Sequence, residues 1–328
     1  MPLPPSSPPP IPGVPPDLDR PLWSVMIPVF NCGTYLQEAL ASVLAQAPDR
    51  KQMEIVVVDD ASTDTDVEGL VRRTGGGRID YIRHPQNVGS VNNFNSCLAR
   101  ALGRYVHLLH ADDRVLPGFY AAIEQLFLEN PQAGACFSRF QYIDEKGVAE
   151  GLANIEGNSP GIVEGWLERI ATENAVAYAS IAVRREVYEQ VGGFFGVNYG
   201  EDWEMWVRIA SRYPMAYTPE LLAEYRVHSE SISGTKHRTG ENIRDIEWVI
   251  QTIQPYLPEE SRRRIGKAAR ASCARDALRM ANRLWHLEGD KEAANNQIRE
   301  AVRVHVDPSL CWGMIKLYME MTFARRWH

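Results

Sequence analysis

Short apolar runs alternate with segments of helical spacing over the first 130 residues of the chain. The clearest run, 105–111, ends abruptly in the adjacent carboxylates of Asp112 and Asp113. A glycine before this run and Pro117-Gly118 after it bound a stretch that is typical of a buried strand. The pattern therefore predicts a buried strand that delivers two carboxylates to a loop.

The same alternation extends along most of the chain. Strands are predicted at 23–31, 53–60, 79–83, 105–111, 133–142, 175–184 and 221–228, and helices at 35–46, 90–102, 116–128 and 201–213. A further helix is predicted after Ser62-Thr63-Asp64, whose side chains are suited to cap its N-terminus. Near-continuous apolar strands that alternate with helices predict an α/β fold with a mostly parallel sheet and helices on both faces.

Polar side chains follow three of the predicted strands. Asn31 follows the first, Asp59 and Asp60 end the second, and Asp112 and Asp113 follow the fourth. Ligands of such sheets bind outside the carboxyl ends of the strands, and oxygen ligands suit Mg²⁺ or Mn²⁺. A single Asp-Asp pair more often caps the next helix, whereas two pairs at one sheet edge favour a metal–diphosphate site.

Composition and charge narrow the class of protein. The 328 residues are 45% hydrophobic and 23% charged, which is ordinary for a globular protein. The net charge is −7, but residues 231–328 carry 17 Lys/Arg against 12 Asp/Glu, whereas residues 1–230 carry 18 against 30. This asymmetry argues against nucleic-acid binding by the larger part. It leaves an anionic partner, such as a membrane surface, open for the C-terminal part.

The cysteines and the N-terminus indicate a reducing, cytoplasmic setting. Five cysteines are scattered without a Cys-x-x-Cys spacing, so neither a disulfide framework nor a zinc site is expected. No signal peptide and no membrane-spanning helix are expected, because long apolar runs are missing. Residues 1–21 contain ten prolines and are predicted to form an extended, disordered tail.

Two other regions carry weaker patterns. Five glycines and little periodicity over 144–165 predict a flexible loop, either a lid over a site or an ordinary surface loop. Beyond about residue 238 the spacing is helical, with apolar stripes over 265–284 and 310–321. These helices are expected to pack on the main domain, with contact to a membrane surface or a lipid-linked acceptor as the alternative.

The ordered set of motifs resembles the family-2 inverting glycosyltransferases of the GT-A fold. The matching segments are 24–31, 35–46, 54–64, 87–89, 110–113, 192–194 and 201–203. Each segment is weakly specific alone, but their order along the chain is highly specific. The resemblance implies a GT-A domain at 22–230, followed by a helical C-terminal region at 231–328.

The resemblance also implies a role for the polar strand ends. In that family the loop after the first strand and the carboxylates after the second hold the base and ribose of a nucleotide sugar, here expected to be a UDP-sugar. A carboxylate suits this role because it accepts hydrogen bonds from a uracil-type N–H or a ribose hydroxyl. The matching residues are Pro28, Phe30, Asn31, Asp59, Asp60, Asn87 and Asp112.

The acidic metal motif of the family matches the segment from His110 to Asp113. The resemblance implies that Asp113 and Asp112, with His228, hold Mn²⁺ or Mg²⁺ on the donor diphosphate. Many relatives begin this motif with Asp, and His110 is not expected to be a direct ligand. An ordinary surface histidine that follows a strand explains His228 equally well.

The catalytic base of the family lies in a Glu-Asp pair before an aromatic residue, here Glu201-Asp202-Trp203. The resemblance implies that Asp202 takes the proton from an acceptor hydroxyl, with Glu201 orienting it or contacting the acceptor. Acidic residues are also favoured in the first turn of any helix. The alternative for Glu201 and Asp202 is therefore a purely structural role at the start of a helix. The acceptor is expected to be a glycan, a lipid-linked group or a protein, in glycan or polysaccharide assembly.

Two other functions fit part of the pattern. A nucleotidyltransferase would also use a parallel sheet and a metal carboxylate, but the first loop, Asn31-Cys-Gly-Thr, lacks the basic residue of the usual phosphate loop. A sugar-nucleotide-binding scaffold without activity has no need of Asp113 and Asp202 together. The glycosyltransferase interpretation is therefore preferred.

Overall fold

The computed structural model describes residues 3–323, which divide into two compact units. Of the described residues, the first unit comprises 3–166, 175–196 and 208–227, and the second comprises 167–174, 197–207 and 228–323. Each unit has its own apolar core. The last division, after residue 227, lies close to the expected domain limit at 230, but two earlier segments also belong to the second unit.

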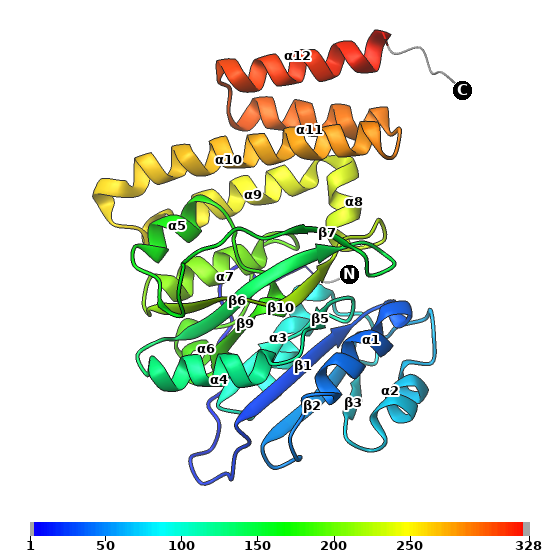
Figure 1. Ribbon diagram of the computed structural model, residues 1–328, viewed down its shortest axis with the longest axis vertical. Coiled ribbons are helices and arrows are strands. Elements are labelled where there is room, and N and C mark those ends of the chain that lie inside the picture. Colours follow the sequence, from blue (N-terminus) through cyan, green and yellow to red (C-terminus); the bar gives the residue numbers. More distant parts are fainter. Residues whose placement is uncertain (1–2, 324–328) are drawn as a thin grey trace. The chain divides into compact units, whose positions relative to one another are not determined.

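The first unit is built on one mixed sheet with the strand order β3-β2-β1-β4-β9-β6-β10-β5 (Figure 1). Strands β7 and β8 pair with β6 and β10. β1 pairs in parallel with β2 and β4, whereas β9 runs antiparallel to β4 and β6. The strands are β1 (Trp23–Val29), β2 (Met53–Asp59), β3 (Asp80–Arg83), β4 (Tyr105–Leu108), β5 (Arg114–Val115), β6 (Ala135–Ile143), β7 (Ala149–Leu152), β8 (Gly161–Ile162), β9 (Ile181–Arg184) and β10 (Met215–Arg226).

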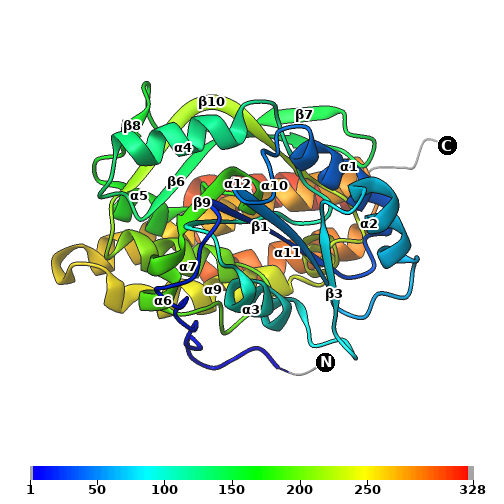
Figure 2. The same cartoon turned by 90° about the horizontal axis from the view of Figure 1, so that it is seen from below.

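Helices cover both faces of this sheet, which confirms the predicted α/β fold. Figure 2 shows α1 and α4 on one face of β1 and α3 on the other. Every residue of β1 is buried, which explains why its sequence is apolar apart from Ser24 instead of alternating. The helices of the first unit are α1 (Gly33–Leu44), α2 (Val67–Gly75), α3 (Ser90–Arg100), α4 (Phe119–Glu129) and α6 (Arg185–Val191), with the 3₁₀ turn η1 (Tyr178–Ser180).

The second unit is helical, as expected for the C-terminal region. Its long helix α10 packs against α11 and α12 through small apolar side chains such as Ala274, Ala277 and Ala281. Within residues 3–323 no helix has the length and apolar character needed to cross a bilayer. The helices are most of α5 (Trp166–Thr172), the start of α7 (Glu201–Ala210), α8 (Ile232–Thr239), α9 (Glu241–Thr252), η2 (Gln254–Tyr256), α10 (Glu259–His286), α11 (Lys291–Val304) and α12 (Pro308–Phe323).

The proline-rich segment differs from the disordered tail that its composition predicts. Over residues 3–21 the chain follows a defined path, and the Gly193 N–H donates to the Pro9 carbonyl oxygen at 2.8 Å. The Arg185 guanidinium donates to the Pro12 carbonyl oxygen, also at 2.8 Å. Proline has no N–H but keeps its carbonyl acceptor, so an extended segment is held here by donors of the first unit.

The segment 144–165 is also more regular than the flexible loop that its glycines predict. It contains β7, which runs antiparallel to β6, and β8, which runs antiparallel to β10. Strands of four and two residues are too short to show a period in the sequence.

Gly103 marks a close approach between the chain before β4 and strand β1. A Cβ on Gly103 would lie 2.4 Å from the Ser24 backbone nitrogen, and the Gly103 N–H donates to Ser24 Oγ at 2.6 Å. Gly103→Ala is expected to lower the free energy of unfolding by about 1–3 kcal/mol, because β1 and β4 would have to move apart. Urea unfolding followed by circular dichroism measures this change.

Gly151→Ala is the matched control, since an added Cβ in β7 meets no atom within 4 Å. Its free energy of unfolding is expected to stay within about 0.5 kcal/mol of the unchanged protein. Equal losses in the two variants would contradict the packing argument.

Candidate functional site

The loops after β1 and β2 are held to each other by side chains at the carboxyl edge of the sheet. The Asn31 N–H donates to Ser62 Oγ at 3.0 Å, and the Thr63 N–H donates to Asn31 Oδ1 at 2.8 Å. Asp64 Oδ2 accepts from the Gly33 N–H at 2.9 Å, where α1 begins. The two loops therefore form one continuous rim.

This pairing corrects the predicted cap of the second helix. The side chain of Asp66 caps α2 by accepting from the Gly69 N–H at 2.9 Å, in place of the predicted Ser62-Thr63-Asp64. Asp64 caps α1, which precedes it in the chain. Several neighbouring residues have cap chemistry, and only the tertiary structure decides which helix each one serves.

Asp59, at the end of β2, is fully buried, and protein donors surround its carboxylate. Oδ1 accepts from the Ser62 N–H at 2.9 Å, and Oδ2 accepts from the Tyr81 hydroxyl at 2.6 Å and from the Arg83 guanidinium. Burial acts to raise the pKa of this carboxyl, but the hydrogen bonds from Ser62 and Tyr81, with the Arg83 charge, lower it below its usual value. Asp59 thus stays ionised and fixes the loop after β2.

Asp60 is buried as well, and it ties the same loop to the turn before α3. Its Oδ1 accepts from the Val88 N–H at 2.7 Å and its Oδ2 from the Gly89 N–H at 3.0 Å. Asn87 Oδ1 accepts a second bond from the Gly89 N–H at 3.1 Å. An ionised carboxylate has about four acceptor positions, so Asp60 keeps capacity for a further donor.

The end of β1 supplies an apolar surface at this edge. Pro28 is buried within the strand, whereas the Phe30 side chain is 42% exposed. Asn31 and Ala61 have φ angles of 48° and 61°, a left-handed conformation that non-glycine residues rarely adopt without surrounding constraints. The exposed Phe30 ring therefore sits on a tightly defined rim and offers a face on which a planar base can stack.

After β4 the chain turns so that His110, Asp112 and Asp113 converge. One ligand atom from each residue lies within 4.8 Å of the other two. The structure thus includes His110 in a cluster where the sequence pattern gave it no direct role. His228, which the resemblance adds to this set, belongs to the second unit.

The Asp113 carboxylate is only 1% exposed, and its two oxygens differ. Oδ1 accepts from the Arg226 N–H at 2.9 Å, whereas Oδ2 is buried and accepts no hydrogen bond. Burial, together with the charge of Asp112, raises the pKa of Asp113 well above its usual value. A buried oxygen without a donor is costly, so the donor set here fits a divalent cation.

His110 presents a second buried atom without a hydrogen-bond partner, its Nε2. The ring stacks on Phe94 with centroids 5.0 Å apart and contacts Tyr178 at 4.2 Å. Burial lowers the pKa of His110, so the imidazole is neutral at pH 7 and can offer a nitrogen lone pair. One nitrogen beside carboxylate oxygens suits Mn²⁺ better than Mg²⁺, which prefers oxygen alone.

Arg226, at the end of β10, holds both aspartates of the cluster. Its backbone N–H meets Asp113, and its Nε donates to the Asp112 carbonyl oxygen at 2.8 Å. The side chain is fully buried, and its Nη2 pairs with Glu38 at 2.7 Å. The guanidinium lies 4.5 Å from the centre of the Tyr35 ring.

Arg114 extends this ion network into the sheet. It pairs with Glu38 at 2.8 Å and with Glu224 at 2.6 Å. The sequence alone suggested no role for Glu38, Arg114, Glu224 or Arg226. The signal that could have pointed to them is the pair Glu224 and Arg226, two charged residues spaced to lie on one face of a strand, and both are buried.

In the second unit, Asp202 is the second residue of α7. Its Oδ2 accepts from the Asn174 amide at 2.9 Å and its Oδ1 from the Trp203 N–H at 2.7 Å. The Trp203 indole donates to the Ile170 carbonyl oxygen at 2.5 Å and is almost fully buried, which anchors this turn. Burial raises the pKa of Asp202 to about 6, against the opposing effect of the Asn174 hydrogen bond.

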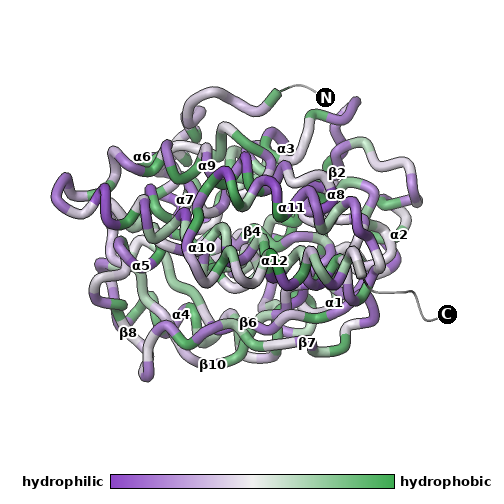
Figure 3. The backbone as a smooth tube through the Cα atoms, turned by 90° about the horizontal axis from the view of Figure 1, so that it is seen from above, coloured by the Kyte–Doolittle hydropathy of each residue, from purple (hydrophilic) through white to green (hydrophobic). Residues whose placement is uncertain are grey.

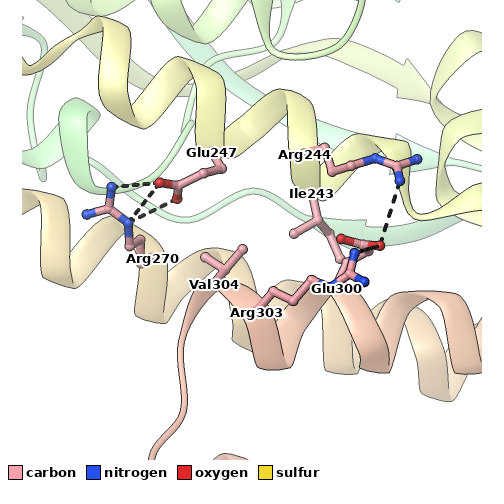
Figure 4. Close-up of a pocket in the computed structure, with 7 residues that line it drawn as sticks. All are labelled: Ile243, Arg244, Glu247, Arg270, Glu300, Arg303 and Val304. Carbon is pink, nitrogen blue, oxygen red and sulfur yellow. Dashed lines mark hydrogen bonds and ion pairs between the residues drawn. The ribbon is translucent and has the colours of Figure 1, made fainter.

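A separate cavity of about 330 Å³ lies among α9, α10 and α11 (Figure 4). Its charged side chains pair with one another, Arg270 with Glu247 at 2.7 Å and Arg303 with Glu300 at 2.8 Å. These pairs satisfy the charges within the protein, so the cavity offers no free carboxylate pair for a metal. It is lined by Ile243, Arg244, Glu247, Arg270, Glu300, Arg303 and Val304.

Sequence comparisons point to one family. Residues 24–192 match the family model described as glycosyl transferase family 2. An uncharacterized glycosyltransferase from Nostoc sp. is 30% identical, with 77% of this chain and 79% of the relative covered. An uncharacterized glycosyltransferase from Haemophilus influenzae is 27% identical over 72% and 75% of the two chains.

Solved structures agree at the level of the fold. S. aureus TarS 1-349 in complex with UDP-GlcNAc has a TM-score of 0.62 and 15% identity, covering 86% of this chain and 91% of that one. The mannosyltransferase PcManGT from Pyrobaculum calidifontis, in complex with GDP-Man and Mn²⁺, has a TM-score of 0.53 and 19% identity. The match covers 94% of this chain and 90% of that one. At such identities the likeness supports the GT-A fold alone.

Arg226→Leu is expected to lower the free energy of unfolding by about 2–4 kcal/mol, because buried carbonyl oxygens lose their donor. The change removes the guanidinium bonds to the carbonyl oxygens of Asp112, Asp144 and Glu145, whereas Glu38, which is 47% exposed, keeps its ion pair with Arg114. Urea unfolding measures the loss. Arg72→Met is the control, because the Arg72 side chain is 77% exposed and its ion pair with Glu68 contributes about 0.5 kcal/mol at most. A loss in Arg226→Leu no larger than in this control would refute the assignment.

Proposed function

The chain belongs to glycosyl transferase family 2, and on this premise we propose that it moves a sugar from a nucleoside-diphosphate donor to an acceptor hydroxyl, with inversion at the anomeric carbon. The observation that carries the proposal is the unpartnered, buried Oδ2 of Asp113, grouped within 4.8 Å of ligand atoms of His110 and Asp112. A cation at this group supplies the positive charge that a diphosphate needs.

The nucleotide is proposed to bind on the rim at the carboxyl edge of the sheet. Phe30 is suited to stack on the base, and Asp60 keeps acceptor capacity for a base N–H or a ribose hydroxyl. Pro28, Asn31, Asn87 and Asp112 complete the set, and Asp59 holds its loop in place. We propose that the base is uracil. Guanine, which also offers N–H donors, is the alternative.

The metal ligands are proposed to be Asp113, His110 and Asp112, with His228 as a further ligand or phosphate contact. When bound, Mn²⁺ neutralises the charge that develops on the departing nucleoside diphosphate. The chain contributes by holding these side chains in place before the donor arrives, through the contacts of Arg226 with both aspartates.

Asp202 is proposed as the general base that removes the proton from the acceptor hydroxyl as this attacks the anomeric carbon. The Asn174 amide and the Trp203 N–H hold its carboxylate in one orientation. A pKa of about 6 leaves Asp202 ionised at pH 7 while making it a stronger base than an ordinary aspartate. Glu201 is proposed to contact the acceptor, which is a glycan, a lipid-linked group or a protein.

Calorimetric titration with UDP and GDP, with and without Mn²⁺, tests the donor site. We expect one diphosphate to bind only with Mn²⁺ present, because the two negative groups otherwise repel. Asp113→Ala is expected to weaken that binding about 100-fold or more, since losing even an outer-shell partner of a metal costs 10–100-fold. Asp80→Ala, which removes a half-exposed surface carboxylate of the same unit, is expected to bind as the unchanged protein does.

The same samples test the role of His110. Pulsed electron paramagnetic resonance of bound Mn²⁺ is expected to show a nitrogen coupling that disappears in His110→Phe. If the folded protein binds neither diphosphate, the donor-site proposal is wrong. Binding without the nitrogen coupling would remove His110 alone from the ligand set.

Asp202→Asn is expected to reduce release of nucleoside diphosphate from the nucleotide sugar, with water as acceptor, by about 10²–10⁴-fold while leaving nucleotide binding intact. The base works only when ionised, so the rate of the unchanged protein should rise as pH increases through about 6 and then level off. Asn174→Ala removes a hydrogen bond that favours the ionised form, so this limb should move to higher pH. A pH limb that stays in place in Asp202→Asn would exclude Asp202 as the base.

A further inference from the structure

Helix α12 has two apolar faces, and only one of them is covered. Leu310, Met314, Leu317 and Met321 are each at most 6% exposed and pack into the helical core of the second unit. The uncovered face carries large apolar side chains at helical spacing. These are Trp312 (67% exposed), Ile315 (53%), Tyr318 (57%) and Met319 (47%). A contiguous patch of this kind marks an interaction site more often than an ordinary surface.

The packing of α12 fixes how this patch runs. Leu310 shares a cluster with Cys273 of α10, whereas Leu317 shares the next cluster with Leu284. The two helices therefore run in the same direction, with the patch along the outer side of α12. Figure 1 shows α12 as the outermost of these helices, and Figure 3 looks down on them from the α12 side.

Basic side chains border the patch along one edge. His286 of α10 contacts Glu320 of α12 at 3.2 Å, so the face of α10 that carries His286 lies beside α12. Arg275 and Arg279 lie on that same face, because they precede His286 by three turns and two turns. Lys316 of α12, with its side chain 66% exposed, lies on the same edge.

Acidic groups at this edge are neutralised locally. Asp276 pairs with Arg279, and Glu320 contacts both His286 and Lys316. Among the described side chains of α12, the exposed ones include no acidic residue. Arg275, Arg279 and Lys316 outnumber the two carboxylates by one, so the edge is weakly basic. The sequence continues with Arg325 and Arg326, which lie outside the described residues.

We propose that this face of α12 docks on the surface of an anionic lipid bilayer. Trp and Tyr are favoured at the interface between lipid and water, and Ile and Met can enter the acyl boundary beside them. Arg275, Arg279 and Lys316 would then meet lipid phosphates, each adding electrostatic attraction. The charge distribution supports this occupant, since residues 231–328 carry an excess of basic residues while residues 1–230 are acidic.

A second copy of the chain fits this face less well. A helix of 16 residues is roughly 24 Å long and about 10 Å wide, so one face offers a few hundred Å². A stable protein interface buries about 800 Å² on each partner. Pairing the same face of two copies would also bring like charges of the basic edge together, which disfavours association.

Flotation with vesicles tests the proposal on the full chain. The unchanged protein is expected to float with vesicles of phosphatidylcholine and phosphatidylglycerol, to float much less with phosphatidylcholine alone, and to be released by high salt. The double variant Trp312→Glu/Ile315→Glu is expected to reduce the bound fraction at least tenfold. Arg275→Glu/Arg279→Glu should remove the preference for the anionic lipid.

Leu128→Glu is the matched control, because Leu128 is 63% exposed on α4 of the first unit and should leave binding unchanged. Circular dichroism confirms that the variants are folded. Equal flotation of the double variant and the unchanged protein would overturn the proposal, as would failure of the unchanged protein to float. Self-association in sedimentation that Trp312→Glu abolishes, without vesicle binding, would overturn it in favour of a second copy. None of these readouts depends on sugar transfer.

Discussion

The arrangement at the sheet edge depends on one buried cation. Arg226 reaches the acidic cluster twice, through its backbone N–H on Asp113 and its Nε on the Asp112 carbonyl oxygen. Its charge also offsets, at close range, the repulsion between two adjacent carboxylates. A buried guanidinium is costly by itself and persists only where every donor finds an acceptor, as Glu38 ensures on the far side. The guanidinium therefore holds the two carboxyl-bearing residues beside each other without being a ligand itself.

The carboxylates of the neighbouring strand serve a related purpose. Asp59 and Asp60 accept hydrogen bonds from strand β3 and from the loops after β2 and β3. The bonds between Asn31 and the Ser62-Thr63 turn add the loop after β1, so all three loops are fixed at the edge where a nucleotide is proposed to bind. A ligand meets a rim whose hydrogen bonds already exist, so little ordering remains to be done when it binds.

The sequence predicted the fold well, because strands buried on both faces leave a continuous apolar signal that needs no tertiary information. The end of β2 was also predictable, since the change from apolar to acidic residues is abrupt at Asp59. β4 ends at Leu108, before the predicted 111, because the apolar residues that follow belong to the turn that brings His110 to the aspartates. Contacts between distant segments were not predictable. Glu38 and Arg226 are 188 residues apart, and the residues around each of them do not predict that the two side chains pair. His110 was set aside because it departs from a family motif, whereas its buried Nε2 becomes visible only once Phe94 and Tyr178 are placed around it.

The proline-rich N-terminal segment affects whether another copy of the chain can pair with this one through backbone hydrogen bonds. Pro9 and Pro12 accept hydrogen bonds from the first unit, and neither has an N–H to turn outward. The sheet itself ends at β3 and β5, and no residue of 3–21 belongs to a strand. A strand docked at this place would present a row of N–H and C=O groups on which another chain could add. Because proline has a carbonyl acceptor and no N–H, this coil is held by the first unit without offering another chain a regular set of donors.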